Sequence, residues 1–285
     1  MNKKTLFAEE STLHYLIEDD AFPEDVQPFI DAVKAQGFPH KIIKQIPCEK
    51  TEFLHLFPEN TPVLFYGSLG LGKSIRKQAN WVPGVYYDVP KYDCTSYYAA
   101  LGKYLLQENY IMLPYAELLR QKEFLYEHVG CDRTIFMRPN RGDKIFTGKA
   151  VYKESYEKDV EYFGFNQIEP FELVVVSEPR NIQFEWRFVV VDGVVVAGSQ
   201  YRENERFDVD ATYPQEAVDF ANLIASKYNP ESVFVVDVCL TKSGQYRLME
   251  VGCFSCAGLY ACDRSKIIES VSAVALREWR DFWEG

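Results

Sequence analysis

Hydrophobic residues recur at two different periods along this chain of 285 residues. Short apolar runs predict three strands in the N-terminal part, at 13–17, 41–46 and 62–66. Apolar residues recur at helical spacing from Val26 to Val33, and a short helix led by Thr51 is expected after the second strand. This alternation of strands and helices is typical of an α/β unit built on a parallel sheet.

The pattern changes after a turn at Trp81-Val82-Pro83-Gly84. Two helices are predicted next, from Ser96, as the N-cap, to Leu106 and from Tyr115 to Val129. From Thr134 on, β-branched and aromatic runs dominate. The predicted strands there are 134–138, 171–177, 183–191, 194–201, 233–240 and 245–251.

Turn residues connect these strands as hairpins. Asp192-Gly193 is a strong two-residue hairpin signal, and Lys242-Ser243-Gly244 is a looser one. Helices are predicted at 214–227 and 265–282. The chain is therefore expected to hold an α/β N-terminal domain, 1–110, followed by an α+β domain with antiparallel sheets, 111–285.

Composition narrows the class of protein. Lys and Arg total 31 against 42 Asp and Glu, so the net charge of −11 argues against a protein that follows nucleic acid or anionic lipid by bulk electrostatics. No signal-peptide pattern and no run of about 18 apolar residues occurs. We therefore expect a cytoplasmic protein without a membrane span.

Seven cysteines are spread over the whole length, which favours a reducing compartment over a disulfide scaffold. Cys253, Cys256 and Cys262 cluster, and a CxxC pair can ligate zinc or carry redox chemistry. No second CxxC occurs and the four histidines lie far upstream, so small buried cysteines are the simpler interpretation.

Charged residues in the second half follow a definite order. Arg138, Lys144 and Arg187 come first, and Asp237 and Glu250 follow, most of them on or beside apolar strands. A charge buried without a partner costs several kcal/mol, at an order of magnitude. A ligand that is highly charged in both senses, such as a nucleotide with its metal, would explain these cations and carboxylates together.

One motif offers a different nucleotide site. Gly67 to Ser74 matches the P-loop pattern GxxxxGK[ST] directly after the strand at 62–66. In a P-loop the backbone N–H groups, Lys73 and Ser74 would bind phosphates and magnesium. Its context is unfavourable, because the expected helix has only Ser74 to Asn80 before the turn and the remaining chain is rich in hairpins.

Two segments suit a nucleotide in the C-terminal half. Residues 139–148 form a polar, glycine-containing and cationic segment that could cover phosphates as a flap. The strand that ends at Ser177-Glu178 could present backbone groups to an adenine edge and a carboxylate to ribose. Asp237 and Glu250, on neighbouring predicted strands, suit Mg²⁺, which takes one or two protein carboxylates beside substrate phosphates.

Four segments together resemble the ATP-grasp superfamily, and most closely a branch of phages and bacteria in which arginine replaces the first nucleotide-binding lysine. They are RPxxxxKxFTG at 138–148, EWRFVVVDG at 185–193, Asp237, and LMEVGCFSCAGLYACD at 248–263. The resemblance implies an ATP-grasp domain for 111–285, with a preceding N-terminal domain, and it implies ATP and Mg²⁺ as cofactors.

The same resemblance assigns roles to residues of this chain. Arg138 and Lys144 would bind phosphates, Arg187 would contact a phosphate or acyl phosphate, and Asp237 and Glu250 would hold magnesium. The adenine hinge would consist of Val174, Val175, Val176, Ser177 and Glu178. The implied reaction is an ATP-dependent carbon–nitrogen ligation, in which a substrate carboxylate forms an acyl phosphate that an amine captures.

Further candidates complete the expected site. Arg202 and the loop 255–258 are expected to hold the substrate carboxylate or the intermediate, with Arg187 and Arg202 as catalytic residues. The family usually has Asn two residues after the second metal carboxylate, where this chain has Gly252. A P-loop ATPase or kinase and a nucleotide-binding interaction protein without turnover stay open as alternatives.

Overall fold

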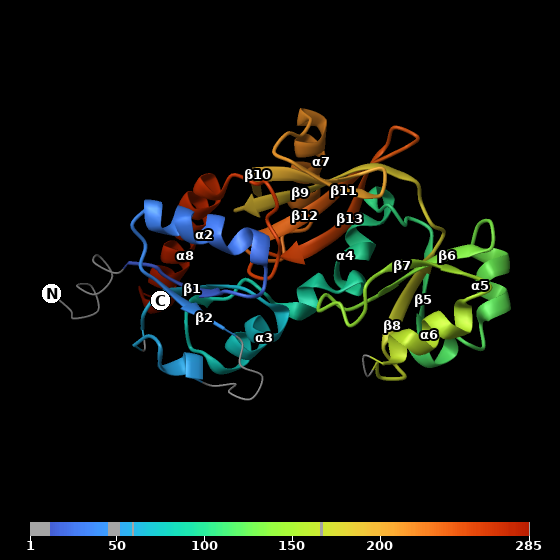
Figure 1. Ribbon diagram of the computed structural model, residues 1–285, viewed down its shortest axis with the longest axis horizontal. Coiled ribbons are helices and arrows are strands. Elements are labelled where there is room, and N and C mark those ends of the chain that lie inside the picture. Colours follow the sequence, from blue (N-terminus) through green and yellow to red (C-terminus); the bar gives the residue numbers. More distant parts are fainter. Residues whose placement is uncertain (1–11, 45–51, 59, 166–167, 285) are drawn as a thin grey trace. The chain divides into compact units, whose positions relative to one another are not determined.

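The computed structural model describes residues 12–44, 52–58, 60–165 and 168–284 (Figure 1). The start of the helix expected at Thr51 lies outside these ranges. Two compact units divide the chain, and each combines segments distant in sequence. The first holds Met1–Asp88, Phe184–Val238 and Glu250–Gly285, and the second holds Val89–Gln183 and Cys239–Met249. The predicted division at 110/111 follows neither boundary and stays a prediction about domains.

The first unit begins as a parallel sheet, as its alternating pattern predicts. Its strand order is β2-β1-β3-β4. The strands are β2 (His40–Ile43), β1 (His14–Glu18), β3 (Val63–Tyr66) and β4 (Pro83–Gly84). Its helices are α2 (Pro23–Ala35) and α3 (Leu69–Gln78), with a 3-10 turn η1 (Glu52–His55). Every residue of β3 is buried, which agrees with its uninterrupted apolar sequence.

A five-stranded sheet carries the hairpins predicted at Asp192-Gly193 and Lys242-Ser243-Gly244. Its order is β11-β10-β9-β12-β13. The strands are β11 (Arg206–Asp210), β10 (Val194–Glu203), β9 (Ile182–Val191), β12 (Val233–Thr241) and β13 (Tyr246–Cys253). Helices α7 (Gln215–Lys227) and α8 (Arg264–Glu284) accompany it. The ends of β9, β12 and β13 continue into the second unit.

One hydrophobic core joins the early and late segments of the first unit. It includes Ile17 of β1, Phe29 of α2, Val189 of β9, Val235 of β12 and Val271 of α8. Helices α2 and α8 contact each other directly, as their blue and red ribbons show in Figure 1. The apolar stripes that predicted these two helices are therefore the faces buried between them and the sheets.

The second unit contains a four-stranded antiparallel sheet in the order β5-β8-β6-β7. Its strands are β5 (Tyr110–Pro114), β8 (Leu173–Ser177), β6 (Thr134–Pro139) and β7 (Lys149–Tyr152). Its helical elements are η2 (Val89–Tyr92), α4 (Cys94–Leu101), η3 (Gly102–Tyr104), η4 (Tyr115–Glu117), α5 (Lys122–His128) and α6 (Tyr156–Gly164). Its core includes Ile135, Met137, Val174 and Val176. The parallel and antiparallel sheets confirm the predicted fold class.

Several sequence-based elements were wrong in detail. Ser96 lies inside α4, whose N-cap is Asp93. The helix predicted from Tyr115 to Val129 is a 3-10 turn followed by the shorter α5, because the N–H groups of Tyr115 and Ala116 bond to the carbonyls of Glu172 and Pro170 and not along a helix. Strands β5, β7 and β11 and helix α6 had no clear sequence pattern. Among the described helices, none has both the length and the apolar character needed to cross a membrane.

Candidate active site

Arg187 of β9 and Asp237 of β12 form a buried, two-pronged ion pair in the first unit. The Nε and Nη2 groups of Arg187 donate to Asp237 Oδ1 and Oδ2 at 2.8 and 2.7 Å. Nη1 donates to the carbonyl of Gly258 at 2.9 Å. Because β9 and β12 are neighbours, residues 50 positions apart in sequence meet in the middle of the sheet. The pair places a predicted phosphate ligand on a predicted metal ligand.

Two aromatic rings flank the same guanidinium. Its carbon lies 5.9 Å from the ring centre of Tyr201 and 5.2 Å from that of Tyr260. The two rings are stacked, with 4.9 Å between their centres. Burial opposes the charged form of Arg187, but the Asp237 carboxylate raises the pKa of this arginine well above its ordinary value. Arg187 therefore stays charged and held in one orientation.

Arg202 of β10 lies beside a second buried carboxylate. Glu185 is 3% exposed, and its Oε1 lies 3.6 Å from Arg202 Nη1. Burial raises the pKa of Glu185, while the hydrogen bond from Tyr201 and the charge of Arg202 act in the opposite direction. The half-exposed Arg202 is thus directed by a residue that sequence reasoning did not select.

Glu250 lies on β13, next to the strand that holds Asp237. A Cβ atom added to Gly252 would lie 3.0 Å from a Val235 methyl carbon and 3.5 Å from Glu250 Oε1. Among the described residues, no three His, Cys, Asp or Glu side chains are grouped as a metal site. Two hard carboxylates on neighbouring strands fit Mg²⁺ when nucleotide and water oxygens supply the other ligands.

In the second unit, Arg138 lies on the sheet face opposite the hydrophobic core. Met137 and Val176 are paired and belong to that core, so their neighbours Arg138 and Val175, also paired, face the other side. Arg138 is 9% exposed, and its Nη1 donates to the carbonyl of Met249 at 3.1 Å. The face that carries Arg138 also carries Ser177, two residues beyond Val175.

The predicted adenine hinge is mostly the inside of a central strand. Residues 174–177 of β8 pair with β5 on one side and β6 on the other, so their backbone groups are engaged. Val174 and Val176 point into the core. Backbone recognition of a base is therefore available only where the strand ends, at Glu178, whose carboxylate lies 3.3 Å from Arg180 Nη1.

The segment predicted as a flap is tied to neighbouring elements. The carbonyl and Oδ1 of Asn140 accept the N–H groups of Cys94 and Thr95, at 2.8 and 2.9 Å, where α4 begins. Gly142 donates its N–H to Asp93 Oδ1 at 2.8 Å. Arg141 pairs with Asp143 and Glu172, and Phe146 is buried against Phe163.

Lys144 is the exposed cation of this segment and has a left-handed backbone, with φ of 51°. A lysine rarely adopts this conformation, which costs on the order of 1 kcal/mol or more. The turn therefore holds Lys144 in a conformation that a glycine would prefer.

The P-loop interpretation of 67–74 is wrong. Residues 69–78 form the helix α3, capped by Ser68, so the supposed loop is already helical. The N–H of Gly72 bonds to the Ser68 carbonyl, and the N–H of Ser68 bonds to the buried Glu18 carboxylate at 2.6 Å. Amides used in this way, beside a carboxylate, cannot cradle phosphates. A Cβ on Gly67 would lie 2.5 Å from Glu18 Cβ, so the glycine permits a close approach.

Cys253, Cys256 and Cys262 lie in and after β13 without a fourth ligand among the described residues. Burial raises the pKa of Cys256, and the Cys256 thiol donates to the Ser68 carbonyl at 3.5 Å. These contacts place the three cysteines in the packing of the loop that follows Glu250.

Comparison with known proteins identifies the class. The fold is that of ATP-grasp proteins, and residues 123–270, more than half of the chain, match a family described as an ATP-grasp domain, the second family of its clade. The chain belongs to this family. Every residue to which the ATP-grasp resemblance assigns nucleotide or metal lies inside the matched range. A search of curated proteins found no match.

Solved structures with low sequence identity share the fold. D-alanine–D-alanine ligase from Bacillus anthracis complexed with ATP is 15% identical, with a TM-score of 0.59 over 96% of this chain and 100% of that chain. D-cycloserine synthetase DcsG is 14% identical, with a TM-score of 0.56 over 95% and 99%. ATP-grasp ligase PsnB with minimal precursor, Mg and ADP is 12% identical, with a TM-score of 0.55 over 93% and 98%.

The structure adds residues that the sequence did not single out. Tyr201 and Tyr260 flank Arg187, Glu185 directs Arg202, and Asp93 holds Gly142. An acidic residue two positions before Arg187 in a buried strand was a usable signal for Glu185. The two tyrosines gave no signal among 19 tyrosines in the chain.

Proposed function

We propose that the protein is an ATP-dependent ligase that joins a carboxylate to an amine through an acyl phosphate. The observation that carries this proposal is the family match over 123–270, which encloses all the predicted cations and both carboxylates of the ATP-grasp site. The printed names of structural relatives, D-alanine–D-alanine ligase and ATP-grasp ligase PsnB, describe ligases that work with amino acids or a peptide precursor. Amino acids or peptides are accordingly the substrate classes to test first.

The proposed nucleotide ligands are Arg138 and Lys144 for phosphates and Glu178 for ribose, with Val174 to Ser177 as the supporting hinge strand. Arg138 stands where many ATP-grasp proteins have a lysine, as in the arginine-containing branch. A guanidinium binds phosphate oxygens through two parallel N–H groups and cannot be deprotonated, which suits this position. Its location on the sheet face opposite the core supports the assignment.

The proposed metal ligands are Asp237 and Glu250. Bound Mg²⁺ would bridge phosphate oxygens and reduce their negative charge. Arg187 orients the Asp237 carboxylate and the Gly258 carbonyl, so it acts through position and through the positive charge it keeps beside them. Arg202 and the loop 255–258 hold the substrate carboxylate in this assignment.

In the proposed reaction a substrate carboxylate oxygen attacks the γ-phosphorus of ATP and ADP leaves. The amine then attacks the acyl carbon, phosphate leaves and the amine loses a proton. The protein supplies orientation for two successive nucleophiles and positive charge around the transferring group, which are the main sources of rate enhancement in phosphoryl transfer.

An isotope experiment tests this reaction. The purified protein is incubated with Mg-ATP and pools of amino acids and short peptides, and a pair that releases ADP is repeated with an ¹⁸O-labelled carboxylate. We expect one ¹⁸O in the phosphate released and ADP release only when carboxylate and amine are both present. Unlabelled phosphate would contradict the acyl phosphate. Glu250→Gln, at a half-buried position, should abolish turnover while keeping the thermal midpoint.

A nucleotide-binding protein without turnover is the second candidate. Gly252 replaces the asparagine expected in the family, and both oxygens of Asp237 accept from Arg187. Tight binding of ATP with no ADP release across the substrate pools would favour this candidate over the ligase.

A further inference from the structure

A polar pocket of about 370 Å³ lies within the second compact unit. Three segments line it: the connection before β5, the chain leaving β8, and the turn between β12 and β13. The lining residues are Leu106 and Glu108, then Glu178 to Asn181, then Thr241 to Ser243 with Gln245 and Arg247. Arg138, Lys144 and Val175 are not among them, so this pocket differs from the proposed phosphate site.

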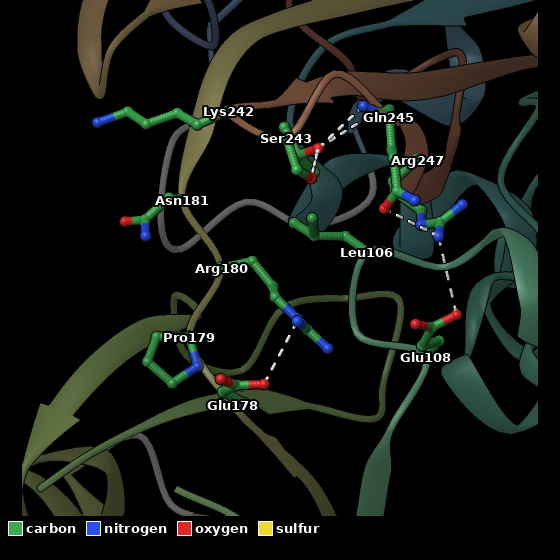
Figure 2. A pocket seen from close by; sticks show the side chains of 11 residues that line it. Leu106, Glu108, Glu178, Pro179, Arg180, Asn181, Lys242, Ser243, Gln245 and Arg247 are labelled. Atoms are coloured by element: carbon green, nitrogen blue, oxygen red, sulfur yellow. Dashed lines mark hydrogen bonds and ion pairs between the residues drawn. The ribbon is translucent and has the colours of Figure 1, made fainter. Parts of the chain in front are cut away.

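Two guanidinium groups are its main charged features. Figure 2 shows Arg180 reaching inward from the chain after β8 and Arg247 lying across from it beside Glu108. Arg180 Nη1 lies 3.3 Å from Glu178, and Arg247 Nη2 lies 3.9 Å from Glu108. Charge-assisted hydrogen bonds are normally about 2.7–2.9 Å long. Both arginines are therefore held by long ion pairs that a better acceptor can replace.

The frame around these arginines is fixed by backbone bonds. Lys242 N–H bonds to the Asn181 carbonyl at 3.1 Å, which joins the hairpin turn to the chain after β8. Thr241 N–H bonds to the Gln245 carbonyl at 3.0 Å, and Leu106 N–H bonds to the Leu248 carbonyl at 2.8 Å. A frame held in this way needs little ordering when a ligand binds, which favours affinity.

Charge selects the kind of ligand. The lining has three cations, Arg180, Lys242 and Arg247, against the carboxylates Glu108 and Glu178, although the whole chain carries a net charge of −11. A locally cationic hollow on an acidic protein attracts small anions and not extended polyanions such as nucleic acid. Its volume lies at the lower end of the range for ligand pockets, about 300–1,000 Å³, which favours a small metabolite.

We propose that this pocket is a second ligand site, which binds a small metabolite through an oxyanion group, either a phosphate monoester or a carboxylate. Arg180 and Arg247 bind the oxyanion, exchanging their long contacts with Glu178 and Glu108 for shorter ones. The hydroxyl and amide groups of Ser243, Asn181 and Gln245 bind the polar body of the ligand. Binding here is separate from the ligase reaction and does not require it.

Titration calorimetry at constant ionic strength tests the site, with glycerol 3-phosphate, succinate and inorganic phosphate as probes. We expect saturable binding of at least one probe with a dissociation constant of about 1 mM or lower. Preference for glycerol 3-phosphate identifies a phosphate monoester as the ligand class, and preference for succinate identifies a carboxylate. Heat that rises linearly for all three probes, without saturation, overturns the proposal.

Matched variants locate the binding. Arg180→Gln and Arg247→Gln keep side-chain length and hydrogen-bonding capacity but remove the charge, so each should weaken the bound probe at least tenfold. Arg206→Gln, on exposed β11 in the other unit, is the control and should leave the dissociation constant unchanged. Equal binding by all three variants contradicts the site.

The affinity for a non-hydrolysable ATP analogue separates this pocket from the nucleotide site. It should be the same in Arg247→Gln and in the unmodified protein. If it falls in proportion to the loss of the probe, the pocket is part of the nucleotide site and the proposal of a second site is wrong. Thermal midpoints of the variants confirm that the half-exposed substitutions leave the fold intact.

Discussion

Two arginine–aspartate pairs in the first unit share one geometry and differ in burial. Arg187–Asp237 has side chains 9% and 8% exposed, whereas Arg277–Asp192 has bonds of 2.7 Å and side chains 51% and 46% exposed. Arg187→Gln leaves Asp237 buried without its partner and should lower the free energy of unfolding by about 3–5 kcal/mol. Arg277→Gln should cost below about 1 kcal/mol.

Urea denaturation of both variants measures this difference. Similar losses in the two variants would contradict the buried ion pair. The comparison also warns that Asp237→Asn tests the metal assignment only when folding is measured alongside turnover, since the same side chain supports the fold.

Glu185 predicts a pH effect at the residue scale. Burial raises its pKa, so the folded protein binds this proton more tightly than the unfolded chain does. The stabilising effect of Glu185 is therefore complete below the unfolded pKa, near 4.5, and is lost as pH rises through the higher folded pKa. Glu185→Gln should remove this dependence, so its stability relative to the unmodified protein should increase with pH. Thermal midpoints between pH 4 and pH 7 measure this, and parallel curves would contradict it.

At the scale of elements, α3 and the segment 139–148 compete for the nucleotide in two substitutions. Lys73 lies on the exposed side of α3, whose first amides are already bonded, so Lys73→Ala should leave ATP affinity unchanged within about twofold. Lys144→Ala should weaken binding roughly 10- to 100-fold, the value of one charge-assisted contact. Calorimetry with a non-hydrolysable ATP analogue decides between them.

A backbone control strengthens that comparison. Lys144→Gly also removes the cation but relieves the left-handed backbone, so it should be more stable than Lys144→Ala by about 0.5–1 kcal/mol while binding ATP equally poorly. Loss of affinity in Lys73→Ala together with full affinity in both Lys144 variants would reverse the assignment of the phosphate site.

The whole molecule makes a prediction about autonomy. The core of the first unit combines Ile17 and Phe29 with Val189, Val235 and Val271, so a fragment 111–285 would expose the apolar faces that residues 12–88 cover. We expect this fragment to bind a hydrophobic dye and to unfold without a sharp transition. Fluorescence and thermal melting of the isolated fragment test this. Co-expression with 1–110 should restore a cooperative transition, and a cooperative fragment by itself would support the boundary at 110/111 as a folding boundary.

The sequence by itself determined most of the elements and the class of protein. Uninterrupted apolar runs such as 63–66 and the stripes of α2 and α8 are local consequences of burial, so they are readable from one sequence. The cations and carboxylates of 138–250 also stood out, because charges beside buried strands need partners. Elements without a periodic pattern, such as the fully exposed β11, gave no such signal.

Only the tertiary structure decided how those residues are used. Strand order brings Asp237 onto Arg187 from 50 positions away and brings Tyr201 and Tyr260 against the same guanidinium, and no local pattern specifies a partner at that distance. The GxxxxGKS match fits a phosphate loop in sequence, yet the contacts of Ser68 with Glu18 and the helix from Leu69 exclude it. Periodicity reports which side chains are buried, whereas the pairing of strands determines which buried side chains meet.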